Sequence, residues 1–109
     1  MPRDKEIGAR IAILRLVSDI TLIFRVHAIQ RMFERGISEI EVRDVLENGE
    51  IIEAYPNDFP FPSRLVLGTS SGRPIHVVVS DDPQAKTTIV ITVYEPDPAR
   101  WDPTFRHRR

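Results

Sequence analysis

Cysteine is absent from the 109 residues of this chain. Disulfide bonds and thiolate-ligated metal sites are therefore excluded. No apolar run reaches the roughly 18 residues that a membrane-spanning helix requires. The charged start over residues 1–6 does not lead into the apolar core of a signal peptide. We therefore expect a cytoplasmic protein without a membrane segment.

The sequence also lacks an excess of positive charge. It carries 15 Lys and Arg against 16 Asp and Glu, with a formal net charge of −1. This balance counts against bulk, sequence-blind binding of nucleic acid, although a local basic site remains open. With 41% hydrophobic and 28% charged residues, the composition is that of an ordinary globular protein. One domain over residues 1–109 is the default expectation.

The stretch over residues 27–35 has the clearest helical pattern. At about 100° per residue the apolar side chains fall on one side and the polar ones on the other. The apolar set is Ala28, Ile29, Met32 and Phe33, and the polar set is His27, Gln30, Arg31, Glu34 and Arg35. His27, Arg31 and Arg35 follow one another at i, i+4 and i+8, and Gly36 is placed to end the helix. An imidazole beside two permanent cations suggests an anion, such as a phosphate, as the ligand.

Two further helices are expected, over residues 4–17 and 38–48. The second begins with a capping box, in which Ser38 and Glu41 satisfy each other's backbone amides, and Ile37 and Val42 occupy the staple positions. Gly49 should end it. Residues 20–24 alternate as in a strand, so we interpret them as a short strand or extended lead-in. A helix running unbroken into residue 27 is the alternative.

Four strand-like runs follow, over residues 50–55, 64–69, 75–80 and 87–94. Ser71-Gly72 predicts a tight turn between the second and third runs, and residues 81–86 a longer loop before the fourth. The expected fold is α+β, with helices over about residues 4–48 packed on a four-stranded antiparallel sheet over about residues 50–95. In the polar tail, residues 96–109, we expect Trp101 and Phe105 to dock and the last arginines to be free.

Strand alternation divides the last two strands into faces. Ile75, Val77 and Val79 share one face, as do Ile89, Ile91 and Val93, and these aliphatic sets should meet the helices. His76 and Tyr94 are then left on the open face. His27 or Arg31 would approach them from the helix edge.

Such a set suits RNA cleavage without a metal, in which the ribose 2′-hydroxyl attacks the adjacent phosphorus. Histidine serves as acid or base, arginine holds the phosphate, and tyrosine stacks a base or donates a proton. We therefore name His27, Arg31, His76 and Tyr94 as candidate catalytic residues. Arg35, Arg73, Arg106 and Arg108 are candidate RNA or phosphate contacts.

Each candidate also has a structural interpretation. His27 can bond a surface carbonyl, His76 can be a satisfied half-buried histidine, and Tyr94 can pack within the sheet. A metal site built from His27, His76 and His107 is disfavoured, because no two of them are closely spaced. We therefore expect neither a metal nor another cofactor.

Several motifs resemble the bacterial family catalogued as domain of unknown function 4258. They are His27-Ala-x-x-Arg31-Met-x-Glu34-Arg35-Gly36-Ile37-Ser38, Tyr55-Pro56, Arg73-Pro74-Ile75-His76-Val77-Val78, Thr92-Val93-Tyr94-Glu95-Pro96-Asp97 and Trp101-Asp102-x-x-Phe105-Arg106-x-Arg108-Arg109. The resemblance covers about residues 5–109. It implies a RelE-type toxin fold within the barnase- and colicin-like RNases. It also implies a neighbouring antitoxin, often with an MqsA-like zinc-finger region.

We therefore expect the toxin of a toxin–antitoxin pair, acting as a metal-independent endoribonuclease on mRNA, free or ribosome-bound. Its expected partners are RNA and a cognate antitoxin. The alternative is a non-catalytic binding module of the same fold that holds an acidic protein or a nucleic acid. A third interpretation is a hydrolase of another phosphodiester.

Overall fold

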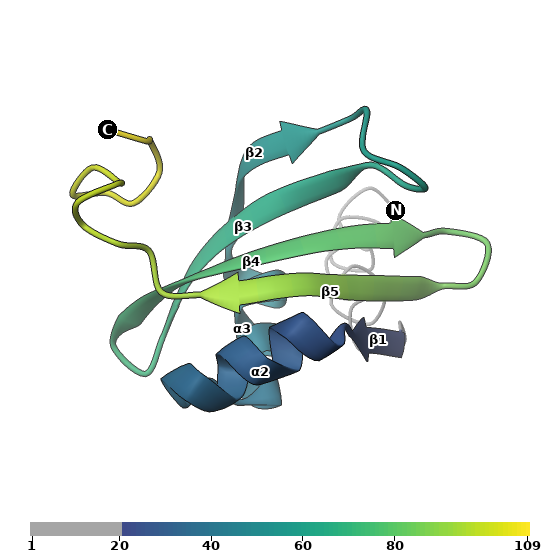
Figure 1. Ribbon diagram of the computed structural model, residues 1–109, viewed down its shortest axis with the longest axis horizontal. Helices are drawn as coiled ribbons and strands as arrows, with labels where there is room; N and C mark the ends of the chain where they lie inside the picture. The colour runs from purple at the N-terminus through teal and green to yellow at the C-terminus, as the bar shows by residue number, and fades with distance from the viewer. Residues whose placement is uncertain (1–20) are drawn as a thin grey trace, which may run out of the picture.

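A computed structural model describes residues 21–109. The helix expected over residues 4–17 lies outside the described residues. The described part is α+β, with two helices and a five-stranded mixed sheet in the order β1-β5-β4-β3-β2 (Figure 1). The strands are β1 (Thr21–Phe24), β2 (Glu50–Tyr55), β3 (Ser63–Ser70), β4 (Arg73–Asp82) and β5 (Thr87–Tyr94).

We expected four antiparallel strands, but the sheet has a fifth strand, β1. It pairs in parallel with β5, with Thr21 opposite Thr87 and Phe24 opposite Val90. The alternation in residues 20–24 indicated a strand, but its partner comes from the far end of the chain, where local pattern carries no information. The other four strands are antiparallel neighbours as expected.

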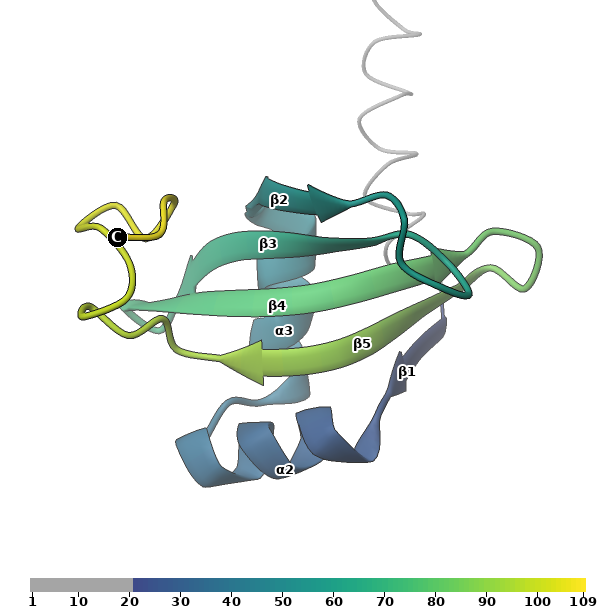
Figure 2. The same cartoon turned by 45° about the horizontal axis from the view of Figure 1, so that its top comes forward.

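The two helices, α2 (Val26–Arg35) and α3 (Glu39–Asn48), pack against one face of the sheet. Figure 2 shows α3 crossing behind β3 and β4, while α2 runs along the β5 side. Gly36 ends α2 in the left-handed conformation, at φ 63°. The capping box is present: Glu41 N donates to Ser38 Oγ at 3.1 Å and Ser38 N donates to Glu41 Oε1 at 3.2 Å. The predicted helical hairpin is therefore confirmed.

The core lies between the helices and the sheet. Its buried members are Ala28, Ile37, Val42, Val45, Val66, Ile75, Val77, Val79, Val90 and Val93. The predicted inward face of β4 is confirmed, since Ile75, Val77 and Val79 are fully buried in this cluster. Both staple residues, Ile37 and Val42, are buried as well.

The predicted inward face of β5 is wrong in its first half. A register shift between Val78 and Val79 places an extra β5 residue in the ladder, so Val79 pairs with Val90 while Val78 pairs with Thr92. A bulge of this kind reverses the side-chain alternation beyond it. Val90 and Val93 consequently enter the core, whereas Ile89 and Ile91 are left out of it, so only Val93 of the predicted set is confirmed.

Only part of the predicted buried face of α2 is buried. Ala28 is buried and Met32 packs against the core, but Ile29 is 52% and Phe33 87% exposed. The helix lies along the β5 side of the sheet, so only one edge of its apolar side has sheet beneath it (Figure 2).

Candidate functional site

The open face of the sheet carries a buried histidine, His76 on β4. Its side chain alternates with the core residues Ile75 and Val77 and so lies on the face opposite the helices, where it is fully buried. The distance from Nδ1 to the Tyr94 hydroxyl is 3.2 Å, and that from Nε2 to the Phe105 carbonyl oxygen is 2.9 Å. A carbonyl can only accept, so Nε2 carries the hydrogen and Nδ1 accepts from Tyr94.

Burial determines the charge of this pair. Burial lowers the pKa of His76, and Arg108 adds to the lowering, while the Phe105 carbonyl and Glu53 oppose it. Burial also raises the pKa of Tyr94. Near neutral pH the pair is therefore an uncharged imidazole that accepts a hydrogen bond from an uncharged phenol.

A second layer of side chains surrounds this pair. Trp101 stands edge-on to His76, with ring centroids 4.5 Å apart, and the Arg108 guanidinium lies 4.6 Å from the Trp101 ring centroid. Arg108 holds Glu53 through two hydrogen bonds of 3.0 and 3.1 Å. Tyr55 donates to the same carboxylate at 2.5 Å. The Arg108 hydrogen bonds lower the pKa of Glu53, while burial, with Glu53 as a second cause, raises the pKa of Tyr55 to about 12.

A cleft of about 270 Å³ opens next to Tyr94. It is lined by Tyr94, Glu95, Asp97, Arg100, Trp101 and Arg108. The lining offers a phenol, an indole and two guanidinium groups together with two carboxylates. Arginine side chains suit the two oxygens of a phosphodiester, so the cleft has the chemistry to hold a phosphate group.

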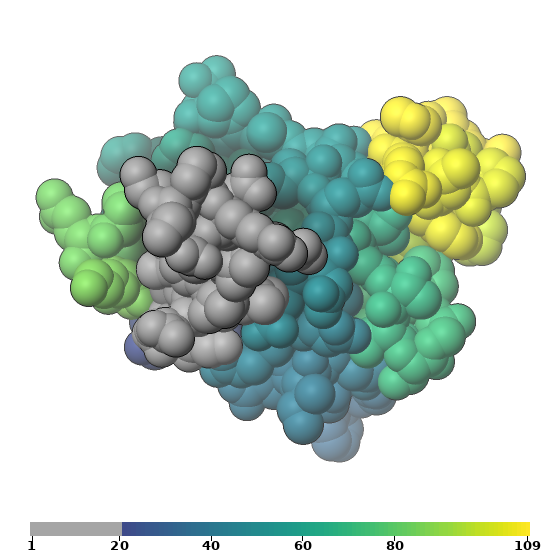
Figure 3. All heavy atoms as spheres, turned by 180° about the vertical axis from the view of Figure 1, so that it is seen from behind, coloured from purple at the N-terminus to yellow at the C-terminus, as the bar shows by residue number. Residues whose placement is uncertain are grey.

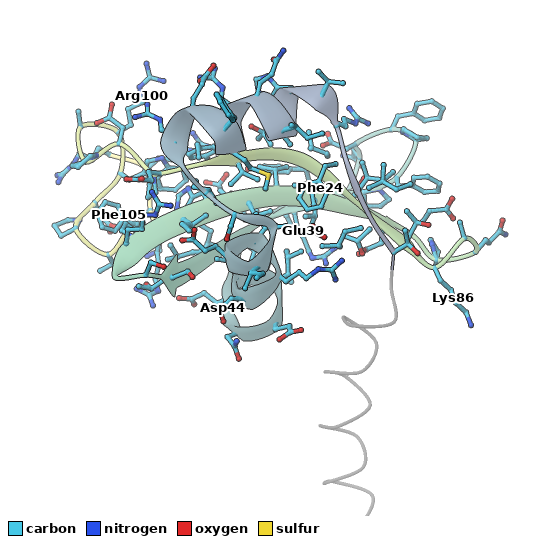
Figure 4. The ribbon with its side chains drawn as sticks, turned by 90° about the horizontal axis from the view of Figure 1, so that it is seen from below. Phe24, Glu39, Asp44, Lys86, Arg100 and Phe105 are labelled. Carbon is cyan, nitrogen blue, oxygen red and sulfur yellow. The ribbon has the colours of Figure 1, made fainter. Side chains whose placement is uncertain are left out.

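The C-terminal tail builds one side of this cleft. Trp101 is 3% exposed, and the tail closes on itself through Asp102 N to His107 O and Arg109 N to Arg100 O, each 2.9 Å. In the view from behind, the tail forms a compact block beside the β3–β4 hairpin (Figure 3). Arg100 and Phe105 lie at this end of the molecule, opposite Lys86 (Figure 4).

The prediction that Trp101 docks is thus confirmed, but the prediction that the last arginines are free is wrong. Arg106 pairs with Glu50 at 2.5 Å, Arg108 pairs with Glu53, and Arg109 donates to the Pro98 carbonyl at 2.8 Å. Phe105 is half-buried and contacts His76 through its backbone. The acidic partners on β2 were not visible as partners in the sequence, because they lie more than fifty positions away.

His27, Arg31 and Arg35 are not part of this arrangement. All three are exposed on α2, which packs on the other face of the sheet, and Arg31 makes a 3.5 Å pair with Glu34. Among residues 21–109, no hydrogen bond or ion pair joins these three side chains to His76 or Tyr94. Of the predicted residues, the structure therefore brings together His76, Tyr94 and Arg108. The three predicted residues on α2 lie apart from them.

Arg73 fastens the helices to the sheet. Its guanidinium donates to the carbonyls of Arg35 and Gly36, at 2.9 and 2.6 Å, and to the carboxylates of Glu95 and Glu41, at 2.9 and 3.4 Å. These acceptors occupy both terminal nitrogens of the guanidinium group, and its Nε is buried without a hydrogen-bond partner among residues 21–109. Its predicted role in phosphate binding remains a prediction.

Sequence reasoning missed Glu53, Tyr55 and Arg100. Strand alternation could have found the first two, because Glu53 and Tyr55 share one face of β2. Arg100 carries no such signal, because it lies in a tail whose conformation depends on contacts with the sheet.

One of the three comparisons with known proteins gives a match. The family described as Domain of unknown function (DUF4258) matches residues 24–95, which is most of the chain, so the chain belongs to this family. The comparison with curated proteins and the comparison with solved structures return no match. No helix of the described residues is long and apolar enough to cross a membrane. Residues 21–109 contain no group of three or more His, Cys, Asp or Glu that would hold a metal ion.

Proposed function

We propose that this chain is an endoribonuclease of the toxin class that cleaves RNA without a metal, and that the cleft beside Tyr94 is its active site. One observation carries the proposal: Tyr94 lines a cleft with two guanidinium groups, and its hydroxyl is hydrogen-bonded to the buried His76. The α+β arrangement, with helices on one face of a sheet, is compatible with a RelE-type toxin. Such a toxin would be paired with a cognate antitoxin.

In this proposal Tyr94 has the reacting role, because His76 is fully buried. The phenol oxygen takes the proton of the ribose 2′-hydroxyl while the phenol proton passes to His76 Nδ1. The 2′-oxygen then bonds to phosphorus as the bond from phosphorus to the 5′-oxygen breaks, and the 5′-oxygen takes a proton from water. The proton on His76 returns through Tyr94 to the hydroxide that remains, which restores the neutral pair. Arg100 and Arg108 stabilise the added negative charge on the phosphoryl oxygens. The products are a 2′,3′-cyclic phosphate and a 5′-hydroxyl.

Cleavage of RNA by the purified chain, with a chelator present, tests this proposal. Tyr94→Phe removes the hydroxyl and keeps the ring, so we expect the rate to fall about 100-fold or more, as for loss of a general acid or base. Phe59→Leu is the control, since Phe59 is 94% exposed and does not line the cleft, and it should retain a rate within about threefold of the wild type.

Variants of the predicted residues on α2 test whether the active site lies there instead. If His27→Ala or Arg31→Ala abolishes cleavage while Tyr94→Phe does not, the site lies on α2 and the cleft is not the active site. If the wild-type chain cleaves no RNA, with or without ribosomes, the enzyme proposal fails.

A second function is favoured by the burial of His76. Both ring nitrogens have partners within the chain and the ring has no exposed surface, as in a structural histidine. A non-catalytic module of this fold would use the same cleft only to bind a phosphodiester. RNA binding that persists in Tyr94→Phe, without cleavage by the wild type, would identify this function.

A further inference from the structure

Arg108 lines the cleft beside Tyr94, and its guanidinium group is held on two sides. The side chain is 60% exposed, so without these contacts it would sample many rotamers. Glu53 accepts from Nε at 3.0 Å and from Nη2 at 3.1 Å, which fixes one edge of the group. Trp101 lies against its face, with the guanidinium carbon 4.6 Å from the ring centroid. The fixed edge and the fixed face together determine the orientation of the group.

The carboxylate that holds Arg108 is itself fixed. Tyr55 donates to Glu53 Oε1 at 2.5 Å, and the Glu53 side chain is 24% exposed. Glu53 and Tyr55 belong to β2, whereas Arg108 belongs to the tail. A side chain on a sheet strand is positioned more precisely than one on an irregular segment, so β2 sets the position of the Arg108 guanidinium.

The opposite edge of the Arg108 guanidinium is open. Nη1 donates no hydrogen bond to any of residues 21–109. A guanidinium group that gives the Nε edge to a carboxylate can still give the edge formed by Nη1 and Nη2 to two phosphate oxygens. Glu53 does not line the cleft, so any effect that it has on a phosphate there is exerted through Arg108.

A second ion pair between β2 and the tail provides a comparison. Arg106 pairs with Glu50 at 2.5 Å, but Arg106 does not line the cleft beside Tyr94. Both pairs attach the tail to β2, and only the pair of Glu53 with Arg108 also orients a group of the cleft.

We propose that Glu53 is a positioning residue, which holds the Arg108 guanidinium in the orientation that binds a phosphodiester, and that Tyr55 holds Glu53. The inference rests on the proposed function, because it takes the cleft as the place where a phosphodiester binds. Its sign is opposite to that of simple charge. A carboxylate repels a nearby phosphate, so removal of its charge alone would strengthen binding, whereas loss of positioning weakens it.

Binding of an uncleavable probe tests the role of Glu53. The probe is a 2′-O-methyl RNA tetranucleotide, in which the attacking hydroxyl is blocked, so binding is measured without cleavage. Glu53→Gln keeps the size of the side chain but replaces one acceptor oxygen by an amide nitrogen. We expect it to weaken binding about tenfold. Glu50→Gln is the matched control, because it removes the other ion pair between β2 and the tail, and it should bind within about twofold of the wild type.

Tyr55→Phe extends the test to the second shared contact. It removes the hydroxyl that holds Glu53 and keeps the ring, so it should weaken binding in the same direction by about threefold. Thermal unfolding of each variant shows whether it is folded at the temperature of the binding experiment. If Glu53→Gln is unfolded there, Tyr55→Phe decides the question.

Trp101 gives a second readout that needs no RNA. It is the only tryptophan of the sequence, and the Arg108 guanidinium lies against its ring, so its fluorescence emission reports where that group is. We expect Glu53→Gln and Arg108→Gln to shift the emission in the same direction, while Glu50→Gln leaves it as in the wild type.

Three results would overturn the inference. Unchanged or tighter binding of the probe by Glu53→Gln would show that Glu53 does not position Arg108 for a phosphate. Equal effects of Glu53→Gln and Glu50→Gln on binding and emission would show that both ion pairs only attach the tail. In these two cases the proposed function stands, provided that Arg108→Gln weakens binding. If the wild type binds no probe, the phosphate-binding cleft and the inference fail together.

Discussion

His76 shows how two hydrogen bonds make a buried titratable residue tolerable at the centre of a sheet. An imidazole without solvent requires a partner at each nitrogen, because an unsatisfied buried polar group costs about 1–3 kcal/mol. Tyr94 and the Phe105 carbonyl supply those partners. The same contacts restrict His76 to one tautomer, with the hydrogen on Nε2.

The lowered pKa of His76 predicts how stability depends on pH. In the unfolded chain this residue takes up a proton near its ordinary pKa of 6.5, whereas the folded chain keeps it neutral to lower pH. The unfolded state therefore binds more protons below about pH 6.5, and the free energy of unfolding should fall as the pH is lowered through this range. Denaturant titrations between about pH 7.5 and pH 5.5 measure the effect.

His76→Gln is the control for this prediction, because glutamine does not titrate. Its free energy of unfolding should change less than that of the wild type over the same range. Among residues 21–109, three carboxylates have lowered pKa values, and they lose their contribution only as the pH falls below their ordinary values, 4.5 for Glu41 and Glu53 and 3.8 for Asp102. An equal slope in both proteins would show that His76 is not the cause.

At the scale of elements, two glycines end the two helices for different reasons. Gly36 ends α2 at φ 63°, where a Cβ would meet no atom within 4 Å, so only its backbone conformation requires glycine. Gly49 ends α3 in an extended conformation that any residue can adopt, at φ −80°. A Cβ there would lie 2.5 Å from the carbonyl oxygens of both Leu67 and Val45. Close packing of α3 on β3 therefore requires that glycine.

This difference predicts unequal costs for two alanine substitutions. Gly36→Ala should lower the free energy of unfolding by about 1–2 kcal/mol, the cost of a left-handed residue with a Cβ. Gly49→Ala should lower it by about 3 kcal/mol or more, because two backbone segments must separate. Denaturant unfolding of the two variants under identical conditions compares the costs. A smaller loss at Gly49 than at Gly36 would show that α3 shifts freely on the sheet.

At the scale of the whole molecule, different segments pack on the two faces of the sheet. The helices bury the aliphatic face, while the tail docks over His76 with Trp101 and with the ion pairs of Arg106 and Arg108. Arg73 forms ion pairs with Glu41 of α3 and with Glu95, which precedes the tail. It therefore links the helices to the start of the tail. The tail is therefore a structural part of the domain and also a wall of the candidate cleft.

Trp101 should contribute most of the free energy that holds the tail on the sheet. It is 3% exposed, and truncation of a buried aromatic typically costs about 3–5 kcal/mol, so Trp101→Ala should lower the free energy of unfolding by that amount. Phe105→Ala is the comparison, because Phe105 reaches His76 through its carbonyl, which alanine keeps. We expect its loss to be below about half of that at Trp101. Similar losses at both positions would mean that the Phe105 ring attaches the tail equally.

The sequence by itself determined the local features of this protein. The capping box at Ser38, the left-handed end at Gly36, the turn at Ser71-Gly72 and the inward face of β4 follow from neighbouring residues, and the structure has all of them. The family also follows from motifs within the sequence.

Tertiary structure decided which distant groups meet. The parallel pairing of β1 with β5 joins segments more than sixty positions apart. The bulge in β5 moves Val90 into the core, and the packing of α2 leaves Phe33 in solvent. The separation of His27 and Arg31 from His76 has the same origin, since a helix and a strand of matching pattern can pack on either face. Local periodicity states which side of an element is apolar, but only packing of the whole chain selects what that side meets.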